Sequence, residues 1–213
     1  ASGQSCVAGS RLLLHESIHE KIIDAIASRA REIVIGDPFE EKSQMGPLAT
    51  LAQLNNIENI VSDATSNGAS LIHGGRRPIH LVKGWYCEPT ILDCPHQNLE
   101  IVQREMFGPV VSVLRFRNEE ESVKLANDTR YGLASGIFTS NIGRALRVTK
   151  SLRTGIVWVN TYRMVSPMVP FGGFKDSGYG RESGMDAIYD YTRPKSVWLN
   201  TSQHPIADPF VMQ

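Results

Sequence analysis

A cysteine near the start of the chain stands among small residues, in the stretch GQSCVAGSR that places Cys6 just before an apolar run. Backbone N–H groups in such a loop favour a thiolate and can hold a developing oxyanion, so the surroundings of Cys6 suit a nucleophile. A lone cysteine is also often a small buried apolar side chain. The residues leave both interpretations of Cys6 open. Cys87 and Cys94, which lie near aromatic residues and proline, are expected to be structural.

The stretch HESIH (15–19) has the H-E-x-x-H spacing of a zinc metalloprotease. That chemistry needs both imidazoles on one face of a helix, with the Glu as general base. Ser17 and Glu20 form an S-x-x-E capping box, which predicts that the helix begins at Ser17. His15 then ends the preceding strand, and no third ligand is nearby. We therefore expect no metal site, and zinc found by metal analysis would overturn this expectation.

Two polar side chains lie beside predicted strands. Glu105 comes two residues before Phe107 and precedes a Gly-Pro turn and a buried strand. A carboxylate there can accept hydrogen bonds from two vicinal hydroxyls, as acidic residues do with a ribose; the alternative is a solvated Glu at a helix end. Asn160 ends the run GIVWVN, at the carboxyl end of a strand, where parallel sheets place their ligands.

The glycine-rich loop PFGGFKDSGYGRE (170–182) combines four glycines with exposed aromatic residues, which is unusual for a linker. It overlaps GYGRESG (178–184), where Ser183 replaces the last glycine of a nucleotide-binding fingerprint and no strand precedes the motif. If the chain uses a dinucleotide, it does so without the usual phosphate-binding turn.

Alternating apolar strands and amphipathic helices surround these residues. Strands are predicted at 10–16, 70–75, 86–94, 110–116, 134–140, 155–160 and 194–200, and helices at 17–33, 50–66, 118–128 and 141–153. A further short helix is predicted after the glycine-rich loop. Asn141 is a natural cap for its helix. The strand–helix–strand–helix–strand unit from 110 to 160 predicts a parallel sheet covered by helices, and thus an α/β fold.

The composition is that of an ordinary globular protein. Its 22 basic and 22 acidic residues give a formal charge of zero, which argues against a nucleic-acid partner. No apolar run approaches the ~20 residues of a membrane helix, so no membrane partner is expected. Three cysteines without a CxxC pair suggest neither a disulfide framework nor a zinc knuckle, and favour a cytoplasmic protein. The chain starts without Met or a signal peptide, as if entered in the middle of a structure.

Several of these segments together resemble one family, the NAD(P)-dependent aldehyde dehydrogenases. The segments are GQSCVAGSR, EMFGPV, YGLASGIFT, GIVWVN and PFGGFKDSGYGRESG, in the family's order and spacing, with GDPF…MGP as a further landmark. The resemblance covers nearly the whole chain but only the second half of a family member. It implies an α/β, parallel-sheet catalytic domain over residues 1–192 and an oligomerisation strand and tail over 193–213. The N-terminal dinucleotide-binding half is absent.

The resemblance also implies a mechanism. Cys6 matches the family's nucleophile, which adds to an aldehyde to give a hemithioacetal and then a thioester, with NAD or NADP as the cofactor. The Cys6 backbone N–H would form half of the oxyanion hole. Glu105 matches the carboxylate that holds the nicotinamide ribose, and Phe107 the aromatic beside it. Glu182 matches a second carboxylate behind the cysteine, either a proton relay or a structural partner of a nearby cation.

The substrate pocket is implied in the same way. Asn160 to Tyr162 and Phe171 match the tunnel wall, while Ser5 and Val7 flank the cysteine. The loop 161–170 brings Arg163, Met164 and Met168 towards the pocket. Arg163 indicates an acidic or polar aldehyde, or else faces solvent.

Other family features have no counterpart here. The general-base Glu, the oxyanion-hole Asn, the cofactor Lys and the phosphate site belong upstream, so the isolated chain is expected to be inactive or weakly active. The closing YTRPKSVWLN resembles an edge strand that pairs across subunits and implies a homodimer or homotetramer. Two alternatives stay open: a CoA-acylating aldehyde dehydrogenase, and a truncated, non-catalytic interaction module. The interaction module is distinguished from an enzyme by whether the native protein includes the upstream half.

Overall fold

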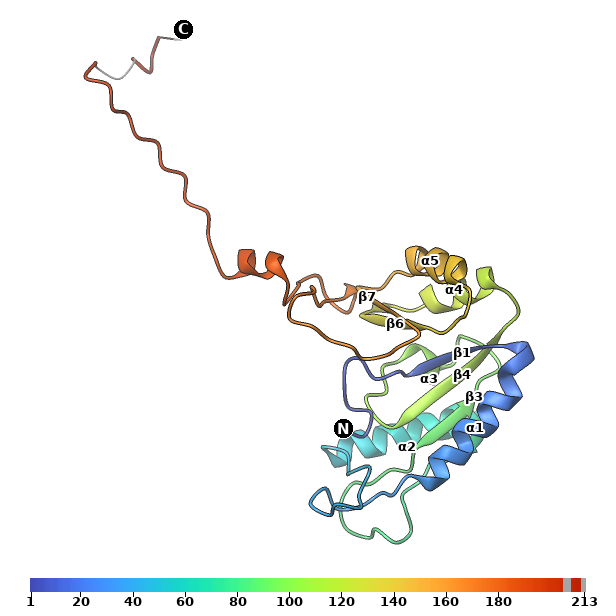
Figure 1. Cartoon of the computed structure of the whole chain (residues 1–213). Coiled ribbons are helices and arrows are strands. Elements are labelled where there is room, and N and C mark those ends of the chain that lie inside the picture. The colour runs from blue at the N-terminus through green and yellow to red at the C-terminus, as the bar shows by residue number, and fades with distance from the viewer. Residues whose placement is uncertain (205–207, 212–213) are drawn as a thin grey trace.

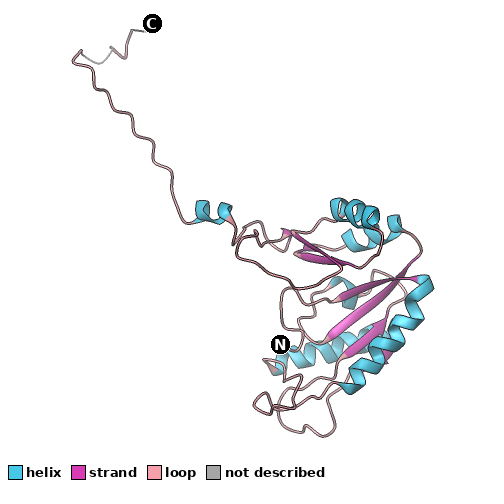
Figure 2. Ribbon diagram, viewed as in Figure 1, coloured by secondary structure: helices cyan, strands magenta, loops and turns pink. Residues whose placement is uncertain are grey.

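The computed structural model describes residues 1–204 and 208–211, and shows a mixed α/β fold with a parallel-sheet core (Figures 1 and 2). The main sheet has the strand order β1-β4-β3-β2. The central strand β4 is parallel to both β1 and β3, while β2 is antiparallel to β3. The bounds are β1 Arg11–His15, β2 Ser70–His73, β3 Thr90–Asp93 and β4 Val110–Phe116.

Helices cover both faces of this sheet because successive strand residues point to opposite sides. Ile91 and Val113 pack with the buried face of α1 (His19–Glu32). Their neighbours Leu92 and Leu114 pack in a second cluster with α2 (Leu51–Ser66) and α3 (Glu100–Gln103). The mostly apolar sequence of β4, VVSVLRF, thus has buried residues on both faces, as expected for a parallel strand.

The segment from 110 to 160 does not form one sheet, contrary to the sequence prediction. After β4, the chain forms α4 (Glu119–Asn127), β6 (Ala134–Ile137), α5 (Ile142–Ser151) and β7 (Ile156–Val159). β6 and β7 are parallel, as predicted, but within residues 1–204 and 208–211 they pair with each other and with no other strand. A short antiparallel pair, β5 (Tyr131–Gly132) with β8 (Phe174–Lys175), ties the glycine-rich loop to this layer. The predicted short helix is the 3-10 helix η2 (Met185–Asp190).

Helix starts show where local sequence signals hold and where they fail. The Asn141 side chain accepts from the Arg144 N–H at 2.9 Å, so the predicted cap is confirmed. The capping box at Ser17 is wrong: a 3-10 turn, η1 (Glu16–Ile18), comes first, and α1 begins at His19 without a side-chain cap. The cause is His15, whose Nδ1 accepts from the Ser17 N–H at 3.2 Å and starts the tighter turn.

Residues 194–200 form no strand in the structure, although the sequence predicts one. They run away from the body as an extended trace after η2 (Figure 1), and no described strand lies beside them to accept their hydrogen bonds. The predicted tail (193–213) also includes 205–207 and 212–213, which lie outside the described residues. Within the part of the chain described, no helix is long and apolar enough to cross a membrane.

Candidate active site

The loop that carries Cys6 is anchored on the turn at 46–49. The hydroxyl of Ser2 donates to the Gly46 carbonyl at 2.7 Å, and the Gln4 side-chain oxygen accepts from the Ala49 N–H at 2.8 Å. Both contacts join segments more than forty residues apart, since the sequence separations are 44 and 45. The position of Cys6 is therefore set by tertiary contacts rather than by a helix or strand.

A second anchor joins the Cys6 loop to the turn before β4. Gly3 has a φ of 71°, and a Cβ there would overlap the backbone carbonyl of Gly108 and lie 2.9 Å from the Pro109 nitrogen. Only glycine fits this left-handed, close-packed position. The cysteine loop and the EMFGPV segment, about a hundred residues apart in the sequence, are thus in direct backbone contact.

Cys6 itself is exposed and free, at the edge of a tight turn closed by a 2.9 Å hydrogen bond from the Ala8 N–H to the Ser5 carbonyl. Val7, next to it, is buried and pins the turn. Among residues 1–204, the N–H of Cys6 donates to no acceptor, so this group is available to a ligand. An accessible thiol beside a free backbone donor is suited to nucleophilic attack on a carbonyl.

The other two cysteines are structural, as predicted. Cys87 and Cys94 are buried, and burial raises the pKa of each thiol to about 11. Such thiols stay protonated near neutral pH and are poor nucleophiles.

Glu105 and Phe107 occupy an exposed turn between α3 and β4. Phe107 has a φ of 45°, an uncommon conformation for a bulky residue, and its ring is 43% exposed. Gln53 holds the turn from α2: its side-chain amide donates to the carbonyls of Phe107, at 3.1 Å, and of Met106. The Glu105 carboxylate is exposed and makes no ion pair within the described residues. A strained backbone held by a second element is typical of a functional site.

Asn160 makes hydrogen bonds at the end of β7 that the sequence did not suggest. Its φ is 54°, and its side chain accepts from the Thr139 N–H at 2.8 Å and donates to the Thr139 carbonyl at 2.9 Å. The amide therefore joins the carboxyl ends of β6 and β7. Asn160 lies where a substrate wall was predicted, but its polar atoms are bound to the protein.

Tyr162 connects the end of β7 to the cysteine loop. Its ring packs on Trp158 with centroids 4.9 Å apart, and a Cβ built at Gly9 would lie 3.6 Å from the Tyr162 hydroxyl. The carboxyl end of β7 thus lies beside the segment that enters β1 from Cys6. Burial raises the pKa of Tyr162, so this phenol stays neutral.

Phe171 and Glu182 face each other across the glycine-rich loop. The Phe171 N–H donates to the Glu182 carbonyl at 2.7 Å, and the Glu182 N–H donates to the Phe171 carbonyl at 2.9 Å. Arg181 fixes the same loop by donating to the Gly173 carbonyl at 2.8 Å. The structure brings these two predicted residues together. Within the described residues, no hydrogen bond joins Glu182 to Cys6.

Sequence reasoning missed two cations that hold the end of α4. Arg11 donates to the Leu125 and Ala126 carbonyls at 3.0 and 2.8 Å, and Lys175 donates to two carbonyls just beyond them at 2.8 and 3.0 Å. Free carbonyls at a helix end are a signal for such cations. The donors, however, come from β1 and β8, far away in the sequence.

In the described residues, the two histidines of HESIH are held apart by different partners. His15 Nδ1 accepts from Ser17, so its Nε2 carries the proton and donates to the Arg117 carbonyl at 3.0 Å. His19 is fully buried, and its Nε2 lies 3.0 Å from an Asp93 oxygen. The two imidazoles serve separate structural contacts, one ending β1 and one under α1.

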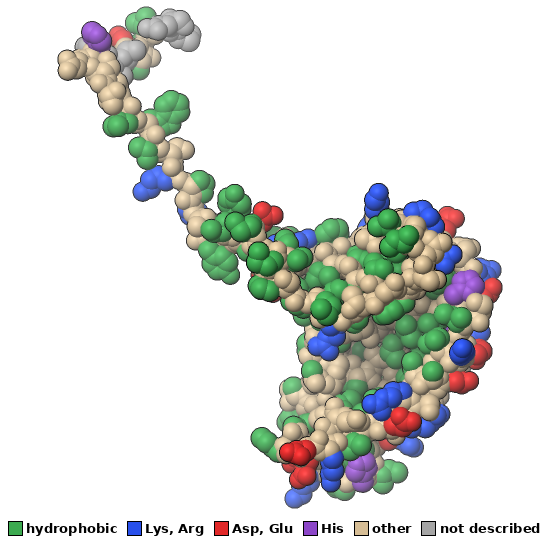
Figure 3. Space-filling view, viewed as in Figure 1, with side chains coloured by type: hydrophobic (Ala, Val, Ile, Leu, Met, Phe, Trp, Pro, Cys, Tyr) green, Lys and Arg blue, Asp and Glu red, His purple; other side chains and the backbone are tan. Residues whose placement is uncertain are grey.

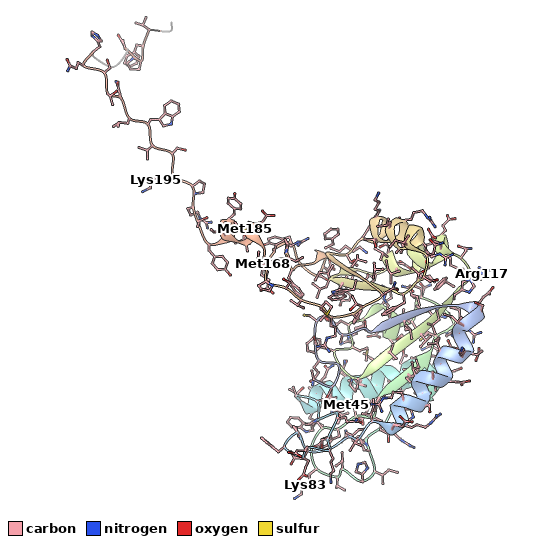
Figure 4. The ribbon with its side chains drawn as sticks, in the orientation of Figure 1. Met45, Lys83, Arg117, Met168, Met185 and Lys195 are labelled. Atoms are coloured by element: carbon pink, nitrogen blue, oxygen red, sulfur yellow. The ribbon has the colours of Figure 1, made fainter. Side chains whose placement is uncertain are left out.

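A cavity of about 340 Å³ lies against the cysteine loop. It is lined by Ala1, Ser2, Gly3, Ser5, Ala8, Arg29, Ile33, Gln44, Met45 and Arg163. Of these, Met45 is labelled in Figure 4. A larger cavity of about 460 Å³ opens at the carboxyl ends of β3 and β4, and none of the predicted site residues lines it.

Comparison with known proteins gives one consistent result. The model of the aldehyde dehydrogenase family matches residues 1–197. The chain is 50% identical to the (Z)-2-((N-methylformamido)methylene)-5-hydroxybutyrolactone dehydrogenase of Acinetobacter baylyi, covering 100% of this chain and 43% of that protein. It is 44% identical to the chloroplastic betaine aldehyde dehydrogenase of Atriplex hortensis, covering 96% of this chain and 41% of the relative.

Solved structures agree. A double mutant of the Staphylococcus aureus betaine aldehyde dehydrogenase, in complex with NAD+, superposes with a TM-score of 0.93 at 38% identity, over 99% of this chain and 43% of that one. A putative aldehyde dehydrogenase from Burkholderia cenocepacia superposes with a TM-score of 0.92 at 40% identity, over 97% of this chain and 43% of that one. The chain thus spans less than half the length of these relatives. On this evidence, the chain belongs to the aldehyde dehydrogenase family.

Proposed function

We propose that this chain is the C-terminal, nucleophile-bearing half of an aldehyde dehydrogenase that oxidises an aldehyde to a carboxylic acid with NAD or NADP. The observation that carries the proposal is the exposed Cys6 thiol in an anchored turn, next to its own free N–H. Membership of the family and the aldehyde substrates in its relatives' names support the reaction class.

In this reaction the Cys6 thiolate adds to the aldehyde carbon, forming a C–S bond and placing negative charge on the former carbonyl oxygen. The Cys6 N–H donates to that oxygen and stabilises the charge. Loss of a hydride from the hemithioacetal carbon leaves a thioester on Cys6. Water then attacks the thioester, releasing the carboxylic acid and restoring the thiol.

The turn before β4 fits a nicotinamide cofactor. NAD(P)+, when bound, supplies the hydride acceptor. Glu105 offers a carboxylate with no ion-pair partner in the described residues, which suits two ribose hydroxyls, and Phe107 offers an exposed ring in a conformation held by Gln53. The backbone contact between Gly3 and Gly108 keeps this turn against the cysteine loop.

We propose roles for the remaining predicted residues as well. Ser5 and Val7 set the turn on either side of Cys6, and Tyr162 supplies an aromatic ring beside Gly9, near that turn, while Phe171 is proposed as a wall of the substrate tunnel. Asn160 orders the end of β7 through Thr139, and its place in the substrate wall stays a prediction. Glu182 keeps an exposed carboxylate, which suits a proton relay once the upstream half is present.

We also propose that residues 193–213 mediate assembly into a homodimer or homotetramer. Figure 3 shows hydrophobic side chains along the segment that leaves the body. Val197, Trp198 and Leu199 are 78%, 96% and 82% exposed, which is costly unless another surface covers them. Light scattering of the full-length protein before and after removal of residues 193–213 tests this: an unchanged mass contradicts it.

Cys6→Ala in the full-length protein tests the proposed reaction. The expected result is a loss of aldehyde-dependent NAD(P)H formation by more than about a thousand-fold, because the nucleophile is gone. Cys87→Ala is the matched control, since that thiol is buried and protonated. Dinucleotide binding, followed by fluorescence titration, is expected to survive in both variants.

Three outcomes would overturn parts of the proposal. Activity retained in Cys6→Ala would remove the nucleophile assignment. An acyl-CoA product formed in place of the free acid would assign the CoA-acylating reaction. A native polypeptide of 23.6 kDa in its own cells would favour a non-catalytic interaction module.

A further inference from the structure

We propose that Arg163 makes this enzyme selective for aldehydes that carry a carboxylate, which binds in the 340 Å³ cavity beside the cysteine loop. The inference rests on the proposed role of Cys6 and goes beyond it by naming the substrate class. It takes up the first of two readings that the sequence left open, an Arg at the pocket rather than an Arg that only faces solvent: Arg163 is exposed and also lines this cavity.

The position of Arg163 is set by its neighbours. Arg163 follows β7 directly after Tyr162, whose ring is packed on Trp158. The Trp158 indole N–H donates to the Met164 carbonyl at 2.8 Å, which fixes the residue after Arg163. Arg163 itself has a φ of 62°, a conformation that a long side chain rarely adopts. Strain that the surrounding contacts maintain is a feature of ligand-binding positions.

Arg163 lines the same cavity as Ser5, the residue next to Cys6. Ser5 and Ala8, which line the cavity, are also the two residues joined by the hydrogen bond that closes the Cys6 turn, although Cys6 itself is not in the lining. The volume of the cavity is at the small end of the range for ligand pockets, which suits an aldehyde of a few carbons.

The charge in this cavity is positive. Two arginines line it, and neither Asp nor Glu is among the described residues that do so. Arg29 is partly neutralised by Glu32, at 3.4 Å on the exposed side of α1. Arg163 takes part in no ion pair within residues 1–204, so its guanidinium is available to a ligand.

A planar guanidinium binds a carboxylate through two parallel hydrogen bonds and disfavours a second cation. A substrate with a carboxylate at one end and an aldehyde at the other could therefore be held by Arg163 while Cys6 attacks the aldehyde. A neutral aldehyde of the same length gains nothing from Arg163, and a cationic aldehyde is repelled.

The test compares three aldehydes in the full-length enzyme: 4-oxobutanoate (anionic), butanal (neutral) and betaine aldehyde (cationic). The expected order of kcat/KM is anionic, neutral, cationic, with at least about a ten-fold step from 4-oxobutanoate to butanal. In Arg163→Met, the ratio of kcat/KM for 4-oxobutanoate to that for butanal is expected to fall by about 10- to 100-fold. Arg163→Lys should recover part of the ratio, because it keeps the charge without the planar fork.

Arg31→Met is the control for loss of a surface charge, since Arg31 lies on the exposed side of α1 and does not line the cavity. It should leave the ratio at the wild-type value. An unchanged ratio in Arg163→Met, or a wild-type preference for butanal or betaine aldehyde, would overturn the inference while leaving the proposed oxidation intact. Failure of the wild type to oxidise any of the three with NAD+ or NADP+ would count against both.

Discussion

The contact between Gly3 and Gly108 makes a strong prediction about stability and activity. In Gly3→Ala, the new methyl group meets backbone atoms of the turn before β4, including the Pro109 nitrogen at 2.9 Å. Backbone atoms cannot rotate away as a side-chain tip can. The φ of 71° adds about 1–2 kcal/mol for a residue with a Cβ, and forcing a methyl into a packed site adds about 1–3 kcal/mol. The expected loss in the free energy of unfolding is therefore about 2–5 kcal/mol.

Gly178→Ala is the matched control. Gly178 also has a positive φ, 110°, but a Cβ there would have no heavy atom within 4 Å. This variant should show only the backbone cost, about 1–2 kcal/mol. The difference between the two variants then isolates the clash with the turn at Gly108.

Urea unfolding of the full-length protein, followed by tryptophan fluorescence, measures the loss for each variant. Steady-state kinetics adds a second readout, because relaxing the clash must displace Cys6 relative to Glu105 and Phe107. A misplacement of about 1 Å at a reacting group can cost about a hundred-fold in rate. If Gly3→Ala matches Gly178→Ala in both stability and kcat/KM, the reasoning about this contact is refuted.

Further predictions concern groups around the site. Asp93→Asn should lower the free energy of unfolding by about 1–3 kcal/mol, because fully buried His19 loses its carboxylate partner; an unchanged urea midpoint would contradict this. Lys175→Met should lower the free energy of unfolding by about 1–3 kcal/mol, because two hydrogen bonds at the end of α4 are lost. A variant as stable as the wild type would contradict this. Burial raises the pKa of Cys87 and Cys94 from 9.0 to about 11. The folded state therefore binds these two protons more tightly than the unfolded state does. The resulting stabilisation is complete below pH 9.0, and the free energy of unfolding should fall as the pH rises from 9.0 towards 11. A urea midpoint that does not change with pH over this range would contradict the prediction.

Much of the fold could be predicted because its signals are local. The apolar run at 110–116 coincides with β4, and the helix ending at Asn67 and Gly68 coincides with α2. The Asn141 cap formed as predicted because its partner, the Arg144 N–H, lies three residues further along the same chain segment. The helix after β1 starts later than predicted because His15, rather than Ser17, provided the first hydrogen-bond acceptor.

The geometry of the site could be predicted only in part. Motifs identified Cys6, Glu105 and Phe107, but the contacts that bring them together depend on Gly3 meeting Gly108, a pairing with no local signal. The same holds for Asn160. The sequence predicted its position at the end of a strand, but not its hydrogen bonds to Thr139, which follows β6. Sequence patterns report local periodicity and residue type, whereas such contacts depend on tertiary packing.

The split of the 110–160 segment into two sheets has the same origin. Periodicity predicts each strand and its parallel sense but not its neighbour. β4 lies between β1 and β3, and its two faces carry buried apolar residues that pack in the clusters of α1 and of α2. In the part of the chain that the structure describes, β6 and β7 pair with each other and with no third strand.

The central claim is that Cys6 forms the covalent intermediate, and trapping that intermediate tests it most directly. The full-length enzyme is mixed with an aldehyde and NAD+ or NADP+, quenched in acid within one turnover, and digested for peptide mass spectrometry. The account predicts an acyl group on the peptide that contains Cys6, and none on those that contain Cys87 or Cys94. An active enzyme whose acyl group lies on another residue, or which carries no acyl group at all, would contradict it.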